Sequence, residues 1–330
     1  TTMLNTLVSR AIAPFLVCAS LISSAAADGM PAGRAEVNRG TVGIVSGSVD
    51  GTYARFAQDV SNVIDQIGDV RVLAILGKGS VQNVLDLLYL RGVDMAIVQS
   101  DVLQAMTTRR LPITDIRDKV RYVAKLYDEE VHLVTRRDIR TIKDLAGLRV
   151  NVDTELSGTN MTARLLFDAL GVPVEFVNQP VAEARAALLR GDIDAMVYVA
   201  GKPVTALATL RAADDLHLLP IDLDKELDAY GYLGGRFTAG DYPALVLGEI
   251  PTISVGAVLA VYDWPEDTSP SSRYQKTARV VREILEALPL LQDGLYHEKW
   301  REVDPSAELN SWTRFKPVQE WLQIKVGDAL

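Results

Sequence analysis

The stretch TVGIVSGSVDGTYARFAQDVSNVIDQI, residues 41–67, decides the fold class. Its first residues, Thr41–Val45, are apolar and β-branched, which predicts a strand. From Tyr53 to Ile67, apolar residues recur at spacings of three and four, which predicts an amphipathic helix. The polar turn Ser46–Thr52 joins the two elements. A strand that enters a helix through such a turn is the first unit of an α/β sheet.

The same alternation continues along the chain. We predict further strands at Arg71–Leu76, Met95–Val98, Val131–Thr135, Arg149–Val152, Val174–Val177, Ala195–Val199 and Thr252–Tyr262. We predict further helices around Val81–Leu88 and at Met161–Leu170, Ala182–Arg190 and Tyr274–Leu291, followed by a tryptophan-rich tail. Two successive β-α-β-α-β units imply two α/β lobes, each with a mainly parallel sheet and right-handed crossovers.

The N-terminal residues 1–27 have the features of a secretory signal peptide. A charged start at Arg10 precedes an apolar segment and the small-residue end Ala25–Ala27. The apolar segment is too short to anchor the chain in a membrane. We therefore expect cleavage after residue 27, a linker at 28–39 and a periplasmic location. We expect Thr1–Thr2 to be an addition ahead of the natural start.

Composition excludes several classes of protein. Hydrophobic residues at 48% and charged residues at 23% are ordinary globular values, which argues against disorder. The net charge of −9 becomes −10 when Arg10 leaves with the signal peptide, so nucleic acid is not an expected partner. The single cysteine, Cys18, lies in the signal peptide, so the mature chain has no disulfide and no thiolate ligand for a metal. No other apolar run reaches the ~18 residues of a spanning helix.

Enzyme motifs are incomplete. The turn Gly77–Gln82 lacks the third glycine of a dinucleotide fingerprint, and it is not a P-loop. Ser46–Ser48 lies between a strand and a helix but lacks the G-x-S-x-G elbow of hydrolases. The three histidines are far apart in the sequence and give no metal spacing: His132, His217 and His297. We expect no cofactor and no catalysis, with a hydrolase-like enzyme as the alternative.

Three polar turns each lie between a predicted strand and a predicted helix: Ser46–Thr52, Gly77–Ser80 and Ser157–Asn160. The first turn of a helix presents unpaired N–H groups and the positive end of the helix dipole. Several such turns at one cleft would bind a carboxylate or another anion. The alternative is that the hydroxyl residues only cap their helices.

The order of these motifs resembles the TAXI family of solute receptors of TRAP transporters. The resemblance rests on Thr41–Tyr53, Gly79–Asn83 and Asp94–Asp101, and later segments fit type II periplasmic binding proteins more widely: Thr141–Val152, Ser157–Thr159, Gly191–Ala195, Gly201–Pro203, Ala239–Pro243 and Pro251–Val255. It covers nearly all of residues 41–290. The sequence departs from the family pattern at Asp50–Gly51, Ala54–Arg55 and in the tail.

The resemblance implies a Venus-flytrap fold with a ligand held between two lobes. Lobe I would combine residues 40–136 and 249–330, and lobe II would be residues 137–248. Ligand would favour the closed form, which a TRAP permease driven by an ion gradient would recognise. A receptor that serves a sensor or an ABC-type permease would look the same in this sequence.

We predict contacts to a small organic anion or amino acid, for example glutamate, from both lobes. Backbone N–H groups at Gly79, Ser80, Gly158 and Thr159 would hold an acidic group, Lys78 could add a charge, and Tyr53 and Tyr198 would wall the ligand. The whole predicted site is Ser46, Gly51, Thr52, Tyr53, Lys78, Gly79, Ser80, Gln99, Ser100, Ser157, Gly158, Thr159 and Tyr198.

Overall fold

The computed structural model describes residues 40–49, 51–67, 70–108 and 116–328. The predicted signal peptide and linker lie outside these residues. Within the described ranges, no helix is both long and apolar enough to cross a membrane.

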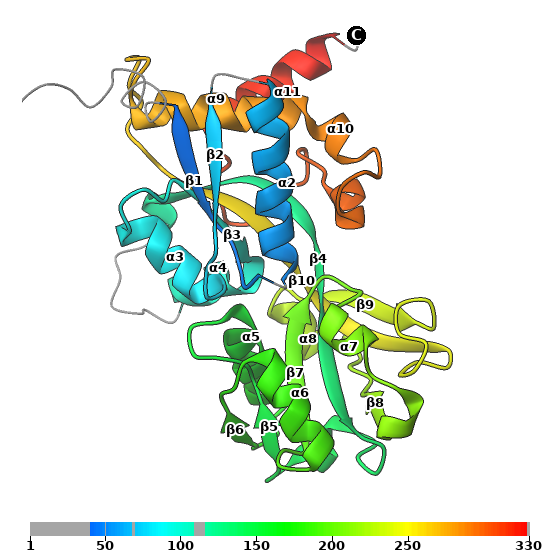
Figure 1. Ribbon diagram of the computed structural model, residues 1–330. Coiled ribbons are helices and arrows are strands. Elements are labelled where there is room, and N and C mark those ends of the chain that lie inside the picture. The colour runs from blue at the N-terminus through cyan, green and yellow to red at the C-terminus, as the bar shows by residue number, and fades with distance from the viewer. Residues whose placement is uncertain (1–39, 50, 68–69, 109–115, 329–330) are drawn as a thin grey trace, which may run out of the picture. The chain divides into compact units, whose positions relative to one another are not determined.

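The first part of the fold is a parallel three-stranded unit (Figure 1). Strand β1 (Thr41–Val45) pairs in parallel with β2 (Arg71–Ile75) and with β3 (Met95–Gln99). The intervening helices are α2 (Thr52–Ile67) and α3 (Ser80–Tyr89), and α4 (Ser100–Thr108) follows β3. This is the β-α-β-α-β unit predicted from the sequence, with α4 as an addition.

A second unit of the same kind follows. Strand β5 (Arg149–Asn151) pairs in parallel with β6 (Glu175–Val177) and with β7 (Ala195–Ala200). Helix α5 (Gly158–Ala169) connects β5 to β6, and α6 (Val181–Arg190) connects β6 to β7. Helix α6 ends at Gly191, which adopts the left-handed conformation expected of a helix terminator.

Two long antiparallel strands, β4 (Val120–Arg136) and β10 (Glu249–Tyr262), join the two units. Strand β10 pairs with β3 and β4 pairs with β7, so one sheet runs in the order β2-β1-β3-β10-β4-β7-β5-β6. The remaining strands pair with these two: β8 (Leu216–Leu218) with β4 and β9 (Leu233–Thr238) with β10.

The remaining elements are short turns and C-terminal helices. They are α7 (Thr205–Ala208), α8 (Lys225–Ala229), α9 (Arg273–Glu286), α10 (Leu288–Leu291), α11 (Lys316–Asp328) and the 3₁₀ turns η1 (Ile116–Asp118), η2 (Ile142–Leu145), η3 (Ala212–Asp214) and η4 (Glu298–Glu302).

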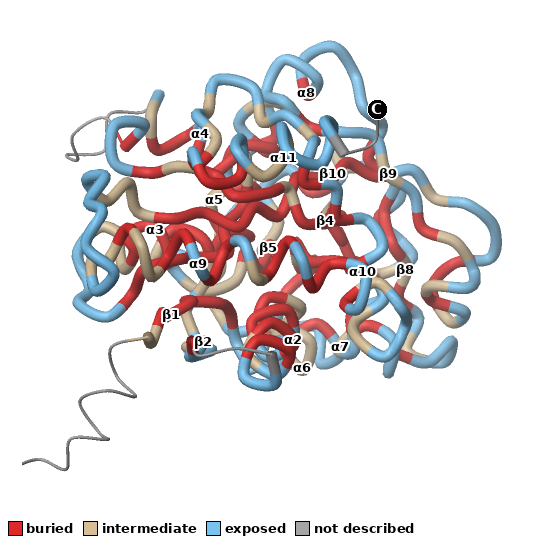
Figure 2. The backbone as a smooth tube through the Cα atoms, turned by 90° about the horizontal axis from the view of Figure 1, so that it is seen from above, coloured by how far each residue is buried: buried red, intermediate tan, exposed pale blue. Residues whose placement is uncertain are grey.

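The hydrophobic cores divide this continuous sheet into two lobes. Strand β4 contributes Tyr127 to a core with α2 and α9, whereas Val131 belongs to a core with α5. Strand β10 changes cores in the same way, between Val255 and Ala257. Buried residues follow the strands and the inner faces of the helices (Figure 2). The protein therefore has the predicted α/β fold, in which two lobes are joined by crossing strands.

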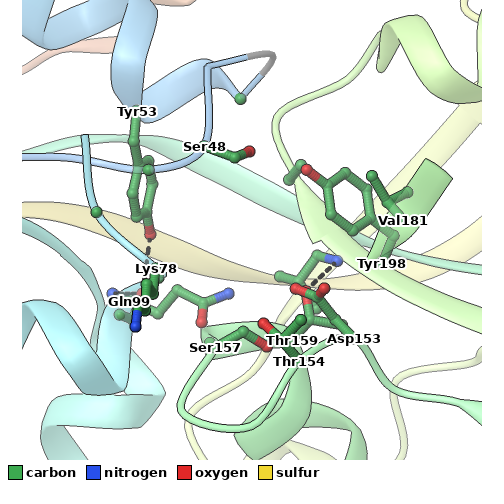
Figure 3. A pocket seen from close by; sticks show the side chains of 18 of the residues that line it. Ser48, Tyr53, Lys78, Gln99, Asp153, Thr154, Ser157, Thr159, Val181 and Tyr198 are labelled. Atoms are coloured by element: carbon green, nitrogen blue, oxygen red, sulfur yellow. Dashed lines mark hydrogen bonds between the residues drawn. The ribbon is translucent and has the colours of Figure 1, made fainter. Parts of the chain in front are cut away.

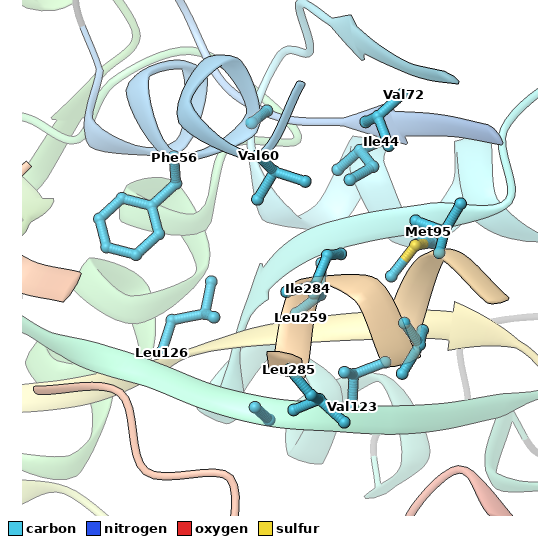
Figure 4. Packing of buried hydrophobic residues seen from close by; sticks show 14 of the residues in the cluster. Ile44, Phe56, Val60, Val72, Met95, Val123, Leu126, Leu259, Ile284 and Leu285 are labelled. Atoms are coloured by element: carbon cyan, nitrogen blue, oxygen red, sulfur yellow. The ribbon is translucent and has the colours of Figure 1, made fainter. Parts of the chain in front are cut away.

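Part of the C-terminal tail packs into the core of the first lobe. Side chains from α2, β4, β10 and α9 meet there, as Figure 4 shows. The ring of Trp300 stacks on Phe56, with 4.2 Å between ring centroids, and its Nε1–H donates to Asp59 at 2.9 Å. Trp300 is therefore a core residue that ties the tail to α2.

Two predicted elements were wrong in extent. The strand predicted at Val131–Thr135 begins eleven residues earlier, at Val120, because charged residues interrupt its apolar pattern. The single helix predicted at Tyr274–Leu291 is two helices. The second of them, α10, has a proline in its first turn, where the missing N–H of proline is tolerated.

Candidate ligand-binding site

A cavity of about 640 Å³ lies where the two lobes face each other at the ends of their parallel strands. The loops that precede α2, α3 and α5 all reach it, together with β7 (Figure 3). This is the edge of an open α/β sheet at which ligands bind. The three turns that the sequence singled out therefore meet at one place.

Eleven of the thirteen predicted site residues line this cavity: Gly51, Thr52, Tyr53, Lys78, Gly79, Ser80, Gln99, Ser157, Gly158, Thr159 and Tyr198. In Figure 3, Tyr53, Lys78 and Gln99 come from the first lobe, and Ser157, Thr159 and Tyr198 from the second. The role of each of these residues as a ligand contact stays a prediction.

The other two predicted residues lie elsewhere. Ser46 is fully buried, and its hydroxyl donates to the carbonyl of Ile75 at 2.8 Å, so it holds β1 to β2. The Ser100 hydroxyl accepts the N–H of Gly256 at 3.0 Å, and Ser100 lines a different cavity beside α4. Neither side chain reaches the cavity between the lobes.

Two glycines allow the loops before α3 and α5 to approach each other. Gly79 has a φ of 116°, and a Cβ atom there would lie 2.9 Å from the Cα atom of Ser157. A Cβ atom on Gly158 would lie 1.5 Å from the side-chain oxygen of Gln99. A side chain at Gly79 would press on the backbone of the other lobe, and one at Gly158 would displace the amide of Gln99.

Several backbone N–H groups of residues that line the cavity have no protein partner. Among the described residues, the N–H groups of Gly79, Ser80, Gly158 and Thr159 donate to no backbone or side-chain acceptor. Helix α3 has no side-chain cap. Four free N–H groups from two helix starts form a ready site for an anionic oxygen.

The hydroxyl groups of the same turns are mostly engaged within the protein. Ser157 caps α5 by accepting the N–H of Asn160 at 3.0 Å. The Ser80 hydroxyl accepts the N–H of Gln99, and the Thr159 hydroxyl accepts the N–H of Val199, both at 3.0 Å. Ser157 therefore caps its helix and also lines the cavity.

Glu129 is a lining residue that the sequence did not reveal. Its carboxyl accepts the hydroxyl of Tyr53 at 2.6 Å, and Tyr53 lies 3.3 Å from the Ser80 hydroxyl. Burial raises the pKa of Glu129 to about 8, and the nearby Asp101 and Glu130 also raise it, against the hydrogen bond from Tyr53 and the charge of Lys299. Glu129 is therefore uncharged at neutral pH.

Two more acids, Asp153 and Glu155, line the cavity from the loop before α5. Burial raises the pKa of Asp153. Lys78, an exposed residue, is the single basic side chain among the described lining residues. Both acids lie with Ser157 in the polar loop between β5 and α5. Their position in the sequence could therefore have identified them, as it identified Ser157.

Contacts between the lobes lie beside the cavity. The N–H of Gln82 in α3 donates to the carbonyl of Leu156 at 3.0 Å. The Thr162 hydroxyl in α5 donates to the carboxyl of Asp101 in α4 at 2.6 Å. These bonds link α3 and α4 of the first lobe to α5 and its preceding loop in the second.

In the described part of the chain, no group of three His, Cys, Asp or Glu residues could hold a metal ion. His132 is fully buried on β4, where its Nε2 lies 2.7 Å from the hydroxyl of Tyr242. His217 contacts the carbonyl of Ile139. His132 therefore lies in the core, and His217 lies on strand β8.

Several solved structures are similar to this chain at low sequence identity. A Xanthomonas citri protein bound to chloride ion matches with a TM-score of 0.50 and 12% identity, over 88% of this chain and 100% of that chain. A mutant of ArgBP from T. maritima gives a TM-score of 0.46 and 18% identity, over 80% and 96%. An amino acid ABC transporter substrate-binding protein from Streptococcus pneumoniae, bound to L-arginine, gives 0.45 and 16%, over 81% and 98%. At 12% identity, the likeness to the Xanthomonas citri protein concerns the fold alone.

A family model gives a more specific assignment. The model of the NMT1-like family matches residues 44–307, which include the second parallel unit, most of the first, both crossing strands and every described residue that lines the cavity. The match extends over most of the chain. The chain therefore belongs to the NMT1-like family.

Proposed function

We propose that this protein is a periplasmic solute receptor that captures a small carboxylate or amino acid between its lobes and does not transform it. Lobe I would comprise residues 40–136 and 249–330, and lobe II residues 137–248. The change of core along β4 and β10 supports this division. The predicted signal peptide supports the location.

One observation carries the proposal. Two residues of one lobe and two of the other line the same cavity and have N–H groups without protein partners: Gly79, Ser80, Gly158 and Thr159. A carboxylate between them would accept hydrogen bonds from both lobes at once. These bonds form together only when the lobes are close, so the ligand would favour the closed form.

The charges around the cavity favour a ligand with both signs of charge. Asp153 and Glu155 line it close to the loop that presents the N–H groups of α5. They would attract an ammonium group and disfavour a second carboxylate nearby. An α-amino acid carries an ammonium group next to a carboxylate, so a glutamate-like amino acid fits this part of the cavity.

We further propose that the receptor delivers its ligand to a TRAP permease, and the TAXI-like motifs support this partner. The closed lobes would present a surface that differs from that of the open lobes, which would let a permease select loaded receptor. Transport in vesicles that contain the TRAP membrane subunits should require this protein and an ion gradient. Transport that required ATP would instead indicate an ABC-type permease.

A thermal-shift screen tests the receptor proposal directly. Amino acids and small organic acids should raise the melting temperature of the purified chain, because a ligand that binds only the folded state stabilises it. Ser157→Trp should abolish the shift because the indole would fill the cavity. Ser271→Trp, at an exposed serine outside the cavity, is the matched control.

Two results would contradict the proposal. The first is a broad panel of acids and amino acids that leaves the melting temperature unchanged. The second is a Ser157→Trp variant that folds, as judged by circular dichroism, and binds as tightly as the unmodified chain. Formation of a product from a bound compound would contradict the claim that the receptor does not transform its ligand.

A further inference from the structure

A second, smaller cavity adjoins the first. It has a volume of about 280 Å³ and shares Gly51, Thr52, Tyr198 and Ala200 with the larger cavity. Its other lining residues are Val49, Arg55, Pro203, Val204, Thr205 and His297. Tyr198 therefore forms part of the wall of both cavities. Figure 3 shows it projecting from β7 on the side opposite Tyr53.

Arg55 gives the second cavity a positive charge. It lies on the first turn of α2, is exposed, and forms no ion pair with any other described residue. Its planar guanidinium can donate two parallel hydrogen bonds to one carboxylate. Among the described residues that line this cavity, none is acidic.

The acid nearest to Arg55 on the same face of α2 is already engaged. Asp59, one helical turn further on, is 5% exposed. One of its oxygens accepts the Nε1–H of Trp300 at 2.9 Å and the backbone N–H of His297 at 3.2 Å. Asp59 is thus committed to the core and leaves the guanidinium of Arg55 available to a ligand.

His297 adds a neutral donor. Burial lowers its pKa, and the charges of Arg55 and Lys299 lower it further, against Asp59 and Glu298. The imidazole is therefore neutral at neutral pH. Its Nδ1 accepts the N–H of Lys299 at 3.2 Å, which assigns the ring proton to Nε2.

We propose that the second cavity is an anion subsite, in which Arg55 and His297 hold the far end of an elongated ligand whose near end lies on the N–H groups of α3 and α5. The inference rests on the proposed function and narrows its ligand class to compounds with two separated acidic groups. The cavities meet at Tyr198, so the connecting carbon chain would pass beside this ring. The acids Asp153 and Glu155 lie in the first cavity only, so they do not oppose an anion beside Arg55.

Matched pairs of acids test the subsite by isothermal titration calorimetry. Succinate, glutarate and adipate each have a monocarboxylate of equal chain length: butyrate, valerate and hexanoate. At least one dicarboxylate should bind at least about tenfold more tightly than the monocarboxylate of equal chain length. This is the gain expected for a hydrogen-bonded charge pair. Arg55→Gln should remove most of that advantage and leave monocarboxylate affinity within about twofold. Arg279→Gln, at an exposed arginine of α9 outside both cavities, is the matched control.

The outcomes separate this inference from the receptor proposal. Dicarboxylates and monocarboxylates that bind equally well would overturn the subsite and leave the receptor in place. So would an Arg55→Gln variant that keeps the full dicarboxylate advantage. If glutamate binds and Arg55→Gln leaves its affinity unchanged, the subsite is likewise overturned, because the second carboxylate of glutamate then lies elsewhere. Failure of every acid and amino acid to bind would overturn both proposals.

Discussion

Helices α3 and α5 both begin at the candidate cavity, but their first turns are built differently. Helix α5 follows Ser157, whose side chain caps the helix through the N–H of Asn160. Helix α3 follows Gly79, which provides no side-chain cap, and its first hydroxyl, Ser80, accepts a hydrogen bond from β3 instead. The capped start is stabilised by its own sequence. At the uncapped start, the corresponding N–H group, that of Gln82, donates instead to the carbonyl of Leu156 in the other lobe.

Each of these helices is linked by hydrogen bonds to a buried acid, which we call the acid behind that helix. Glu129 bonds Tyr53, beside Ser80 of α3, and Asp101 bonds Thr162 in α5. Burial raises the pKa of Glu129 to about 8 and that of Asp101 to about 6. At neutral pH the acid behind α3 is protonated, whereas the acid behind α5 is mostly ionised. The two starts should therefore respond differently to pH.

The largest expected effect comes from Glu129. An ordinary glutamate releases its proton near pH 4.5, whereas folded Glu129 keeps it to about pH 8. As pH rises between these values, the unfolded chain holds fewer protons than the folded protein. The Glu129 contribution to the free energy of unfolding should therefore fall, by at most about 1.4 kcal/mol per pH unit. Glu129→Gln, which stays neutral, should reduce this slope.

Urea unfolding between about pH 6.5 and 8 measures the Glu129 effect. This range lies above the pKa of Asp101, so the buried acid behind α5 changes little in it. Asp101→Asn is the matched control. It should instead reduce the slope of the free energy of unfolding against pH between about pH 4 and 6. A Glu129→Gln variant with the same slope as the unmodified chain would show that Glu129 is already ionised.

The second effect concerns the uncapped start of α3. Gly79→Ala should lower the free energy of unfolding by about 1–3 kcal/mol, because its φ of 116° strains any residue with a Cβ atom. The new atom would also press on the loop before α5 and weaken binding of any ligand between the lobes. Gly92→Ala is the control, since Gly92 has a φ of 95° and open space around it. Equal binding by the two variants would argue against close approach of these loops as a requirement.

The third effect tests the bond behind α5. Thr162→Val removes the donor to Asp101 and should cost about 1–2 kcal/mol of stability. The cost should be larger at about pH 7.5 than at about pH 5, because a hydrogen bond to an ionised carboxylate is stronger. Thr277→Val removes a buried hydroxyl that bonds only the carbonyl of Arg273 in its own helix, and it serves as the control. A cost that does not vary with pH would contradict an ionisable partner.

The smallest effect concerns the cap itself. Ser157→Ala should cost about 1 kcal/mol, the usual value for a lost N-cap. Ser272→Ala removes the corresponding cap of α9, where Ser272 accepts the N–H of Gln275 at 3.1 Å, and should cost a similar amount. Only Ser157→Ala should also change ligand affinity, because only Ser157 lines the cavity. If both variants bind alike, Ser157 is a cap and not a ligand contact.

Local patterns predicted most of the fold. The helices at Thr52–Ile67 and Val181–Arg190 differ from their predicted bounds by one residue, because an apolar stripe and a terminating glycine are local signals. The first part of β4 gave no such signal. Glu129 and Glu130 interrupt its apolar pattern, and both are buried only because Tyr53 and Lys299, from distant parts of the chain, contact them.

The sequence by itself determined the alternation of strands and helices, the polar turns between them and the glycines at those turns, since each depends on backbone preferences within a few residues. Only the tertiary structure decided which side chains face the cavity. Ser46 points into the sheet, whereas Ser48, two residues later, lines the cavity. Arg55 and His297 are 242 residues apart, yet both line the second cavity. Such pairings follow from how the sheet and the two cores bring distant segments together, and no local pattern encodes that.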